Sequence, residues 1–546
     1  MRISARELLE QLLDTESFVS WDRPPVTVAA TPRYRDALWN AAVAAGTDES
    51  VLTGEGLLRG RRVAVIACEF GFLAGSIGVA AAERIVAAVE RATELGLPVV
   101  ASPTSGGTRM QEGTVAFVQM VKIAGAVAAH KSAGYPYLVY LRNPTVGGVF
   151  ASWGSLGHVT FAEPGALIGF LGPRVYQALY GRPFPEGVQT AENLYRRGVI
   201  DGVLPISVFR RIAHRALSVF SGVNLSASAA AQPDTTQDRD PIASESRQEA
   251  THDAALQLSD AARRPDGHSK TPVPEQNRSG GASLPSEGGP AWQSVLISRR
   301  PERPGIRDLL RHVTQRVPLS GTGQGESDRT VAHALGRFRG QPCVVFGHDR
   351  RGQQGENTMG PAALREARRS MALAQELRLP LVLVIDTVGA ALSKEAEERG
   401  LAPEIARCIA DLVTLDTPTI SVLLGQGTGG GALALLPADR VLAATHGWLA
   451  PLPPEGASAI VFRDTGHAAE LAAAQRISAA DLLADGVVDR IVPEYPDAAD
   501  EPVDFARRMV AAVAGELASL RARSEPELLA ARKARYRRLG LPGVAD

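Results

Sequence analysis

The hydrophobic residues of this chain follow two alternating patterns. Short, continuous apolar runs at 97–101 and 136–141 are typical of strands that are buried on both faces of a sheet. Between such runs, apolar residues recur every three to four positions, as at 79–95, which is the spacing of a helix with one buried face. Strands that alternate with helices predict a largely parallel α/β core.

Other segments extend this pattern toward both ends. Residues 1–20 begin as an amphipathic helix, and residues 54–67 mix glycine, arginine and aliphatic residues as a hairpin does. A glycine-rich loop that includes Gly75 follows at 70–78. The helical spacing returns near the other end, where a basic helix is expected at 525–538.

The composition changes abruptly in the middle of the chain. Residues 221–298 are rich in Ser, Ala, Gln, Asp, Arg, Pro and Gly, and Trp292 is their only aromatic residue. Such a segment buries too little apolar surface to offset the entropy of ordering it, so it is predicted to be a disordered linker. The expected organisation is therefore one domain at 1–220, a linker at 221–298 and a second domain at 299–546.

The two flanking parts repeat one another at a constant offset of 282 residues, which places Leu97-Pro98 opposite Leu379-Pro380. The remaining matches are glycines at strand ends: Gly107 with Gly389, Gly147-Gly148 with Gly429-Gly430, and Gly165 with Gly447. Farther on, GVID at 198–201 matches GVVD at 486–489 with an offset of 288. The repeat predicts two homologous domains from a duplication, and its period is far too long for a solenoid.

Glycine at these strand ends has a physical reason. Without a side chain, backbone N–H groups can approach a ligand oxygen closely, and the backbone can adopt positive φ. Such N–H groups stabilise an oxyanion or a phosphate. A tight turn or close helix–strand packing would also select glycine, but equivalent pairs in both repeats favour the ligand site.

Composition excludes several classes of protein. The formal net charge of −1 gives no reason to expect nucleic acid. Three widely separated cysteines, Cys68, Cys343 and Cys408, indicate neither a zinc ribbon nor a disulfide framework, and no metal site is expected. No run of about 20 apolar residues lacks charges or helix breakers, and the first residues lack an apolar signal core. We therefore expect a cytoplasmic protein with no membrane span.

The sequence offers no familiar side-chain catalyst. No glycine run ends in Gly-Lys-Ser/Thr, and no G-x-S-x-G nucleophile motif is present. His130, His158 and His446 are scattered, and packing or surface roles are expected for them. The chemistry is therefore expected to depend on backbone donors.

At this point the residues resemble a known family, the biotin-dependent acyl-CoA carboxyltransferases. SGGTRMQEG (105–113) and NPTVGGVFAS (143–152) resemble the β-subunit of acetyl-CoA carboxyltransferase, while IDTVGAALSKEAEERG (385–400) and GQGTGGGALAL (425–435) resemble its α-subunit. The resemblance implies a fused β–α enzyme with two crotonase-like domains. It also implies partners: a biotin carboxyl carrier protein, a biotin carboxylase and at least one further copy of this chain.

The resemblance assigns a role to each glycine turn. Amides of Gly147, Gly148 and Val149 would hold the thioester oxygen of the acyl-CoA, and amides of Gly429, Gly430 and Gly431 would hold the ureido oxygen of carboxybiotin. Gly75, Gly106, Gly107 and Gly389 would shape the substrate sites. Carboxybiotin would then supply both the CO₂ and the base that removes the α-proton.

The chain departs from the family pattern in two places, and three alternative functions remain open. The chain lacks the four-cysteine zinc ribbon common in β-subunits, and Val388 replaces the proline of the family turn at 386–390. The alternatives are a biotin-dependent decarboxylase component, a non-catalytic scaffold and a crotonase-like hydratase or isomerase. A hydratase needs carboxylates in its cleft, and Glu112 is the only candidate near a glycine turn. Glu112 is expected instead to complement a helix dipole.

Overall fold

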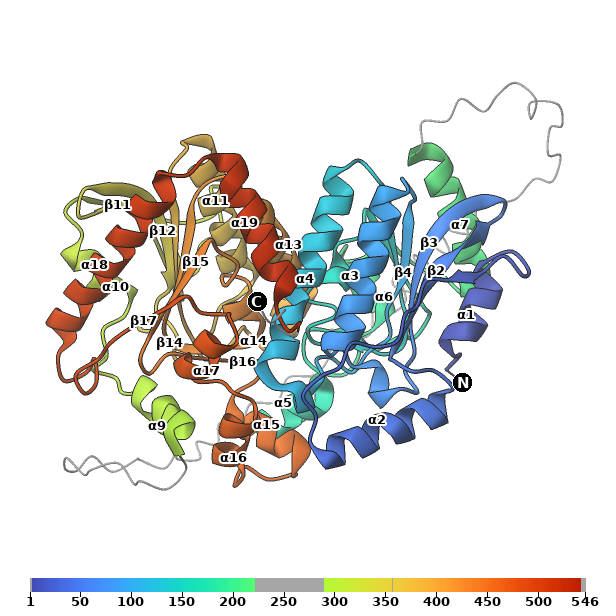
Figure 1. The fold of residues 1–546 in the computed structure, drawn as a ribbon, viewed down its shortest axis with the longest axis horizontal. Coiled ribbons are helices and arrows are strands. Elements are labelled where there is room, and N and C mark those ends of the chain that lie inside the picture. The colour runs from blue at the N-terminus through green and yellow to red at the C-terminus, as the bar shows by residue number, and fades with distance from the viewer. Residues whose placement is uncertain (1, 221–288, 356, 542–546) are drawn as a thin grey trace, which may run out of the picture. The chain divides into compact units, whose positions relative to one another are not determined.

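The computed structural model describes residues 2–220, 289–355 and 357–541 (Figure 1). Residues 221–288 of the linker predicted at 221–298 lie outside these residues. Residues Met1–Leu217 and Ser286–Asp546 belong to one compact unit. Each half of this unit is built on its own sheet.

The sheet of the first half has seven strands in the order β1-β2-β3-β4-β5-β7-β9. The strands are β1 (Val19–Ser20), β2 (Val51–Leu58), β3 (Arg61–Cys68), β4 (Val99–Ser102), β5 (Tyr137–Leu141), β7 (Val159–Ala162) and β9 (Gly202–Val203), with β6 (Thr145–Val146) and β8 (Ile168–Gly169) paired apart. β2 and β3 form the predicted hairpin, and the strands from β3 to β9 are parallel. The prediction of a parallel core is confirmed.

The second half repeats this arrangement. Its strands are β10 (Arg316–Leu319), β11 (Val331–Phe338), β12 (Gln341–His348), β13 (Leu381–Thr387), β14 (Thr419–Thr428), β15 (Arg440–Ala444), β16 (Trp448–Ala450) and β17 (Arg490–Val492). They form an eight-stranded sheet in which β11 and β12 are the hairpin and the strands from β12 onward are parallel. The predicted duplication is confirmed at the level of topology.

Helices cover both faces of each sheet. The helices of the first half are α1 (Ala5–Leu12), α2 (Pro32–Ala45), α3 (Val79–Glu94), α4 (Gly113–Ser132), α5 (Pro173–Tyr180), α6 (Ala191–Arg196) and α7 (Ile206–Phe220). Those of the second half are α9 (Gly289–Ser298), α10 (Ile306–Leu309), α11 (Pro361–Glu376), α12 (Lys394–Glu398), α13 (Leu401–Thr414), α14 (Gly429–Leu433), α15 (Pro454–Val461), α16 (Ala468–Ala474), α17 (Ala479–Ala484), α18 (Pro502–Arg521) and α19 (Glu525–Arg538). α3 and α11 begin and end exactly one repeat offset apart.

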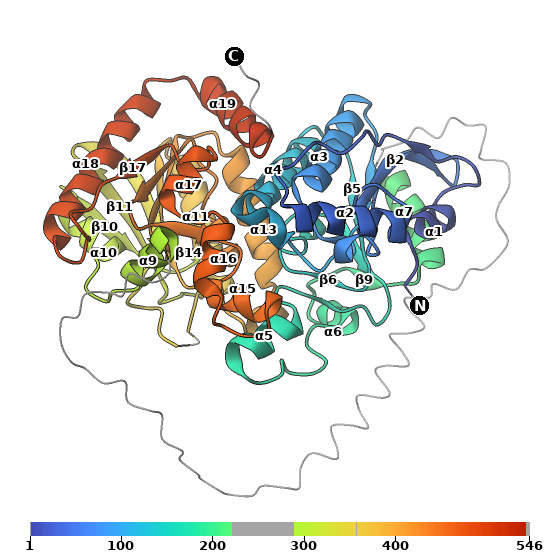
Figure 2. The ribbon, with the colours of Figure 1, turned by 60° about the horizontal axis from the view of Figure 1, so that its bottom comes forward.

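Four of these helices share one hydrophobic core. Apolar residues of α3 and α4 and of α11 and α13 belong to a single cluster that also contains residues of both sheets. The opposite faces have separate cores, made with α1 and α7 in the first half and with α10 and α18 in the second. Figures 1 and 2 show α4 next to α13, where the two halves meet.

The α4–α13 contact is close because α4 carries a glycine there. A β-carbon added to Gly125 would lie 3.0 Å from Cγ1 of Val413. The stretch Met110–Ser132 is long and apolar enough to cross a membrane, but 78% of its most apolar window is buried within the protein. Its hydrophobicity is explained by its place in the shared core.

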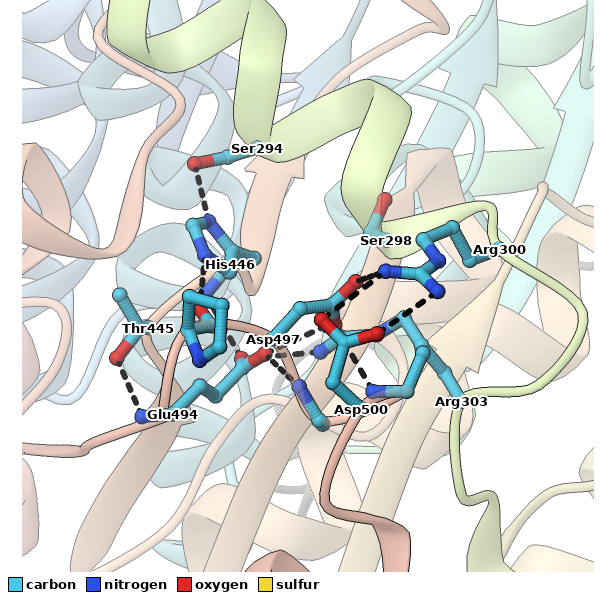
Figure 3. A network of polar contacts seen from close by, with 12 residues as sticks. Ser294, Ser298, Arg300, Arg303, Thr445, His446, Glu494, Asp497 and Asp500 are labelled. Carbon is cyan, nitrogen blue, oxygen red and sulfur yellow. Dashed lines mark hydrogen bonds and ion pairs between the residues drawn. The ribbon is translucent and has the colours of Figure 1, made fainter. Parts of the chain in front are cut away.

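The predicted linker extends too far at its carboxyl end, because Gly289–Ser298 form helix α9. Val295 of α9 is buried against Trp448, and the Trp448 indole N–H donates to Ser298 Oγ at 2.8 Å. After the helix, buried Arg303 forms ion pairs with Glu494 at 2.6 Å and with Asp497, as Figure 3 shows. These partners lie about 150 to 200 residues away in sequence, so the local composition could not reveal them.

Helix α19 of the second half forms ion pairs with the first half. Its Arg537 contacts Glu83 at 2.6 Å and Glu90 at 2.8 Å on α3. Arg532 is buried and pairs with Asp439 at 2.6 Å within the second half. The basic helix predicted at 525–538 is therefore present, and its cations are used in packing.

Gly125→Leu should lower the free energy of unfolding by about 1–3 kcal/mol, because the larger side chain overpacks the contact with Val413. The matched control is Gly515→Leu in α18, where a β-carbon would meet no atom within 4 Å. The free energy of unfolding of that control should rise by about 1 kcal/mol, because Leu has a higher helix propensity than Gly. Urea denaturation followed by circular dichroism measures both. Equal effects of the two variants would contradict the α4–α13 contact.

Candidate active site

A cavity of about 410 Å³ lies between the two halves, and both glycine turns line it. The first half contributes Gly106, Gly107, Thr108, Met110, Phe117, Val146, Gly147, Gly148, Ala151, Phe170, Leu171, Gly172, Val175 and Tyr180. The second half contributes Gly355, Thr358, Val388, Gly389, Ala390, Leu392, Ile405, Thr428, Gly429, Gly430, Leu433, Pro451, Leu452, Pro453 and Ile460. None of these described residues is charged.

The turns that follow β4 and β13 have the same construction. Gly107 has φ +117° and Gly389 has φ +137°, a region that favours glycine. The Gly107 N–H donates to Ser105 Oγ at 3.0 Å, and the Gly389 N–H donates to Thr387 Oγ1 at 3.1 Å. Equivalent hydroxyls thus fix equivalent glycines on the cavity wall.

The turns that follow β6 and β14 also correspond. Gly147 has φ +70° and Gly429 has φ +61°. The next glycine in each turn is tightly packed. A β-carbon added to Gly148 would lie 3.1 Å from Thr108 Oγ1, and one added to Gly430 would lie 2.8 Å from Phe170 Cε2. Both positions therefore leave no free room for a side chain.

Most amides of these turns are available as donors, but the Gly147 N–H is not, because it donates to the Gly169 carbonyl at 3.2 Å. No backbone acceptor is recorded for the N–H groups of Gly148 and Val149 within the described part of the chain. Gly429, Gly430 and Gly431 begin α14, where N–H groups lack intrahelical acceptors, and Thr428 does not cap them with its side chain. Such donors can stabilise negative charge on an oxygen.

Three of the predicted site residues are not part of the cavity lining. Val149 and Gly431 lie directly beside lining residues and can contribute only their amides. At Gly75, which has φ +63°, a β-carbon would lie 2.2 Å from the Thr104 carbonyl oxygen. The backbone contact explains the glycine at position 75 without a ligand.

Two features of the cavity were not predicted from the sequence. The Thr428 hydroxyl is buried on the cavity wall and has no hydrogen-bond partner among the described residues. The Phe170 ring of the first half packs against Gly430 of the second. Glycine matching locates the turns, but only the folded chain shows which side chains face them.

Arg109, next to the first glycine pair, has a structural role. It is 1% exposed, and its guanidinium binds both carboxylate oxygens of Glu49, at 3.0 and 2.5 Å. It also donates to the Ser76 carbonyl at 2.7 Å, and the Ile77 N–H donates to the Gly107 carbonyl at 3.1 Å. This network holds the first turn in place from behind.

Glu112 does not line the cavity. Its carboxylate accepts from the Val79 N–H at 2.6 Å and from the Tyr34 hydroxyl at 2.5 Å. It thus complements the N-terminus of α3, rather than that of the helix that follows it in sequence. A hydratase mechanism with Glu112 as the base has no support in this geometry.

The three scattered histidines also lie away from the lining. His130 contacts Thr93 Oγ1 at 2.9 Å, the Tyr137 N–H donates to His158 Nδ1 at 3.0 Å, and His446 contacts Ser294 Oγ at 3.1 Å, as seen in Figure 3. These contacts are packing roles, as predicted. Among the described residues, no group of three His, Cys, Asp or Glu side chains is placed to hold a metal.

Comparisons with known proteins identify the family. The family described as "Carboxyl transferase domain" matches residues 2–528. The chain belongs to this family. Its family resemblance is therefore confirmed, and it is a biotin-dependent acyl-CoA carboxyltransferase.

Two relatives with similar sequences agree with this assignment. The "Probable biotin-dependent acyl-coenzyme A carboxylase beta3 subunit" of Mycobacterium bovis is 60% identical over 542 residues, 99% of each chain. The "Acetyl-coenzyme A carboxylase carboxyl transferase subunits beta/alpha" of Salinispora arenicola is 36% identical, covering 99% of this chain and 91% of the relative. The crystal structure of transcarboxylase 12S matches with a TM-score of 0.34 and 19% identity, over 95% of this chain and 90% of the other.

Arg109→Met in this carboxyltransferase should lower the free energy of unfolding by about 3–5 kcal/mol, because it leaves the Glu49 carboxylate buried without a cation. Adding Glu49→Leu should recover most of that loss, since it removes the unpaired charge. Urea denaturation of the two single variants and the double variant measures the coupling. If the double variant lost as much free energy of unfolding as the two single variants together, the Arg109–Glu49 pair would not hold the turn.

Proposed function

We propose that this carboxyltransferase moves a carboxyl group from carboxybiotin on a carrier protein to acetyl-CoA or another short acyl-CoA, giving malonyl-CoA or methylmalonyl-CoA. The observation that carries the proposal is that glycine turns from both halves line one cavity without a charged side chain among its described lining residues. A reaction that needs no side-chain base fits such a cavity. It also fits the relatives named as carboxylase subunits.

Each turn is assigned one carbonyl oxygen. The amides of Gly148 and Val149 would hold the thioester oxygen, so that negative charge on the enolate is stabilised as it forms. Gly147, whose own N–H donates to the Gly169 carbonyl, would shape the turn. Gly106 and Gly107 would shape the same side of the cavity. Donors placed in advance act strongly because water is displaced and nothing has to reorganise.

The second turn fits the ureido group of biotin. Gly429, Gly430 and Gly431 would donate to its oxygen, with Gly389 beside them, and the free Thr428 hydroxyl supplies one more polar contact. Carboxybiotin supplies the carboxyl group when it is bound. The lining residues orient both substrates and exclude water, and their uncharged side chains leave the proton transfer to the substrates themselves.

The proposed activity requires partners. A biotin carboxyl carrier protein and a biotin carboxylase would deliver the carboxylated biotin, and we propose at least a homodimer in the cytoplasm. Sedimentation tests the dimer, because a monomer would sediment as a single species of 57.6 kDa. The acyl-CoA preference requires an assay with a panel of substrates, since one methylene changes binding by only about 1–3 kcal/mol.

Gly148→Val and Gly430→Val test the two turns separately. Each should lower kcat/KM by about 10²- to 10³-fold, because the added side chain collides with Thr108 at the first turn or with Phe170 at the second and shifts the amide donors out of position. The Gly148→Val defect should be greatest in the KM for acyl-CoA, and the Gly430→Val defect in the KM for a free biotin derivative. Radiolabelled carboxylation measures both.

Gly515→Val is the matched control, since an added β-carbon at this exposed position meets no atom within 4 Å. Circular dichroism checks that all three variants fold. Folded Gly148→Val and Gly430→Val proteins that carboxylate at the parent rate would show that the glycines serve packing alone.

Thr428→Val removes the unpaired hydroxyl and keeps the shape of the side chain. The KM for the biotin derivative should rise about threefold to tenfold, the effect of one hydrogen bond, with little change in the KM for acyl-CoA. Thr428→Ser should retain near-parent values. The same KM shift in Val and Ser variants would contradict a contact through the hydroxyl.

A further inference from the structure

Glu397 of α12 places a buried carboxylate from the second half inside the first half. Its oxygens accept from the Phe170 N–H at 2.8 and 3.1 Å and from the Gln189 side-chain amide at 2.7 Å. The Leu171 N–H is a further donor to it. The side chain is therefore held by hydrogen-bond donors of the first half alone.

Among the described side chains, no cation pairs with this carboxylate. Of the nearby charged groups, Arg197 of α6 pairs with Glu398 at 3.0 Å, Lys394 lies 4.0 Å from Glu398, and Arg399 pairs with Glu395 at 2.9 Å and with Glu326. Burial raises the pKa of Glu397 to about 7, even though the hydrogen bonds from Gln189, Phe170 and Leu171 act in the opposite direction. A buried carboxylate without a counter-ion is unfavourable for folding, which suggests a functional reason for it.

The segment that Glu397 holds is part of the cavity wall. Phe170 and Leu171 both line the cavity, and the Gln189 amide also donates to the Leu171 carbonyl at 2.7 Å. The Phe170 ring would lie 2.8 Å from a β-carbon on Gly430. The carboxylate, the Phe170 backbone and the second glycine turn thus form one continuous set of contacts.

Among the described residues, no carboxylate from the opposite half supports the first glycine turn in this way. The repeat offset of 282 places Val115 at the position of Glu397. The corresponding start of α4 contacts the second half through Thr114, whose N–H and hydroxyl both donate to the Gln475 carbonyl at 3.0 Å. The buried carboxylate therefore serves only the second turn.

We propose that Glu397 is a positioning residue for the biotin side of the cavity: it fixes the Phe170–Leu171 segment so that the Phe170 ring closes the second glycine turn. This inference rests on the proposed function, which assigns that turn to carboxybiotin. The first half thereby completes the biotin site of the second half.

The test uses the full chain, a free biotin derivative and acetyl-CoA. Glu397→Ala should raise the KM for the biotin derivative about tenfold and leave the KM for acetyl-CoA within about twofold. Glu397→Gln should restore most of the loss, because its amide oxygen can still accept from the Phe170 N–H. Glu398→Gln is the matched neighbour, and it should leave both KM values near those of the parent.

The pH dependence gives a second readout, even if Glu397→Ala does not fold. In the parent, protonation below about pH 7 turns one accepting oxygen into a hydroxyl, as the Gln replacement does with an amide nitrogen, so the KM for the biotin derivative should rise to about that of Glu397→Gln as the pH falls through that value. Glu397→Gln should lack this step.

A buried acid with a raised pKa also makes the free energy of unfolding fall as the pH rises from about 4.5 to about 7. Glu397→Gln should lose that slope as well.

Four outcomes decide between the hypotheses. A selective biotin-side effect with rescue by Gln supports the positioning role. Equal changes in both KM values, or the same pH step in parent and Glu397→Gln, would overturn it. If Gly430→Val impairs the biotin side and Glu397→Ala does not, the proposed function stands and this inference fails. If Gly430→Val itself has no effect, the proposed function fails first.

Discussion

The packing of α4 against α13 is the constraint on which the site depends. Each helix follows a glycine turn of its own half, so close contact between the helices brings the two turns to one cavity. Gly125 allows that approach because a side chain there would meet Val413. Equivalent elements contact one another reciprocally, as in an interface between two copies of one domain. The duplicated fold thus creates a site that neither half contains alone.

A cavity built in this way suits chemistry that uses backbone donors. Its described lining residues are uncharged, and charged groups such as Arg109, Glu49 and Glu112 lie behind the first turn, where they are paired or bound by backbone amides. Charge therefore fixes the position of the loops without entering the cavity. Glycine sets the backbone conformation of the turns, because Gly107 and Gly389 have positive φ angles that other residues rarely adopt.

The sequence predicts the elements of this fold better than its contacts. The buried strands, the repeat and the glycine turns follow from local apolar patterns and from matches at a fixed offset. Helix α9 was missed because its partner Trp448 lies far away in sequence. Glu397 and Thr428 were missed for a related reason: neither belongs to a local motif of catalytic side chains, and their importance appears only when the other half is folded against them.

Duplication gives two equivalent scaffolds, and the side chains around their glycine turns differ. Glu397 has Val115 as its counterpart, and the Phe170 ring at the second turn has Leu452 as its counterpart. The aromatic ring comes from the first half, yet it closes the turn of the second half. A change on one side of the interface can therefore alter one substrate site without disturbing the backbone of the other. Shared packing thus keeps the two turns together, while the side chains around them differ, as the proposed assignment of each turn to a different carbonyl group requires.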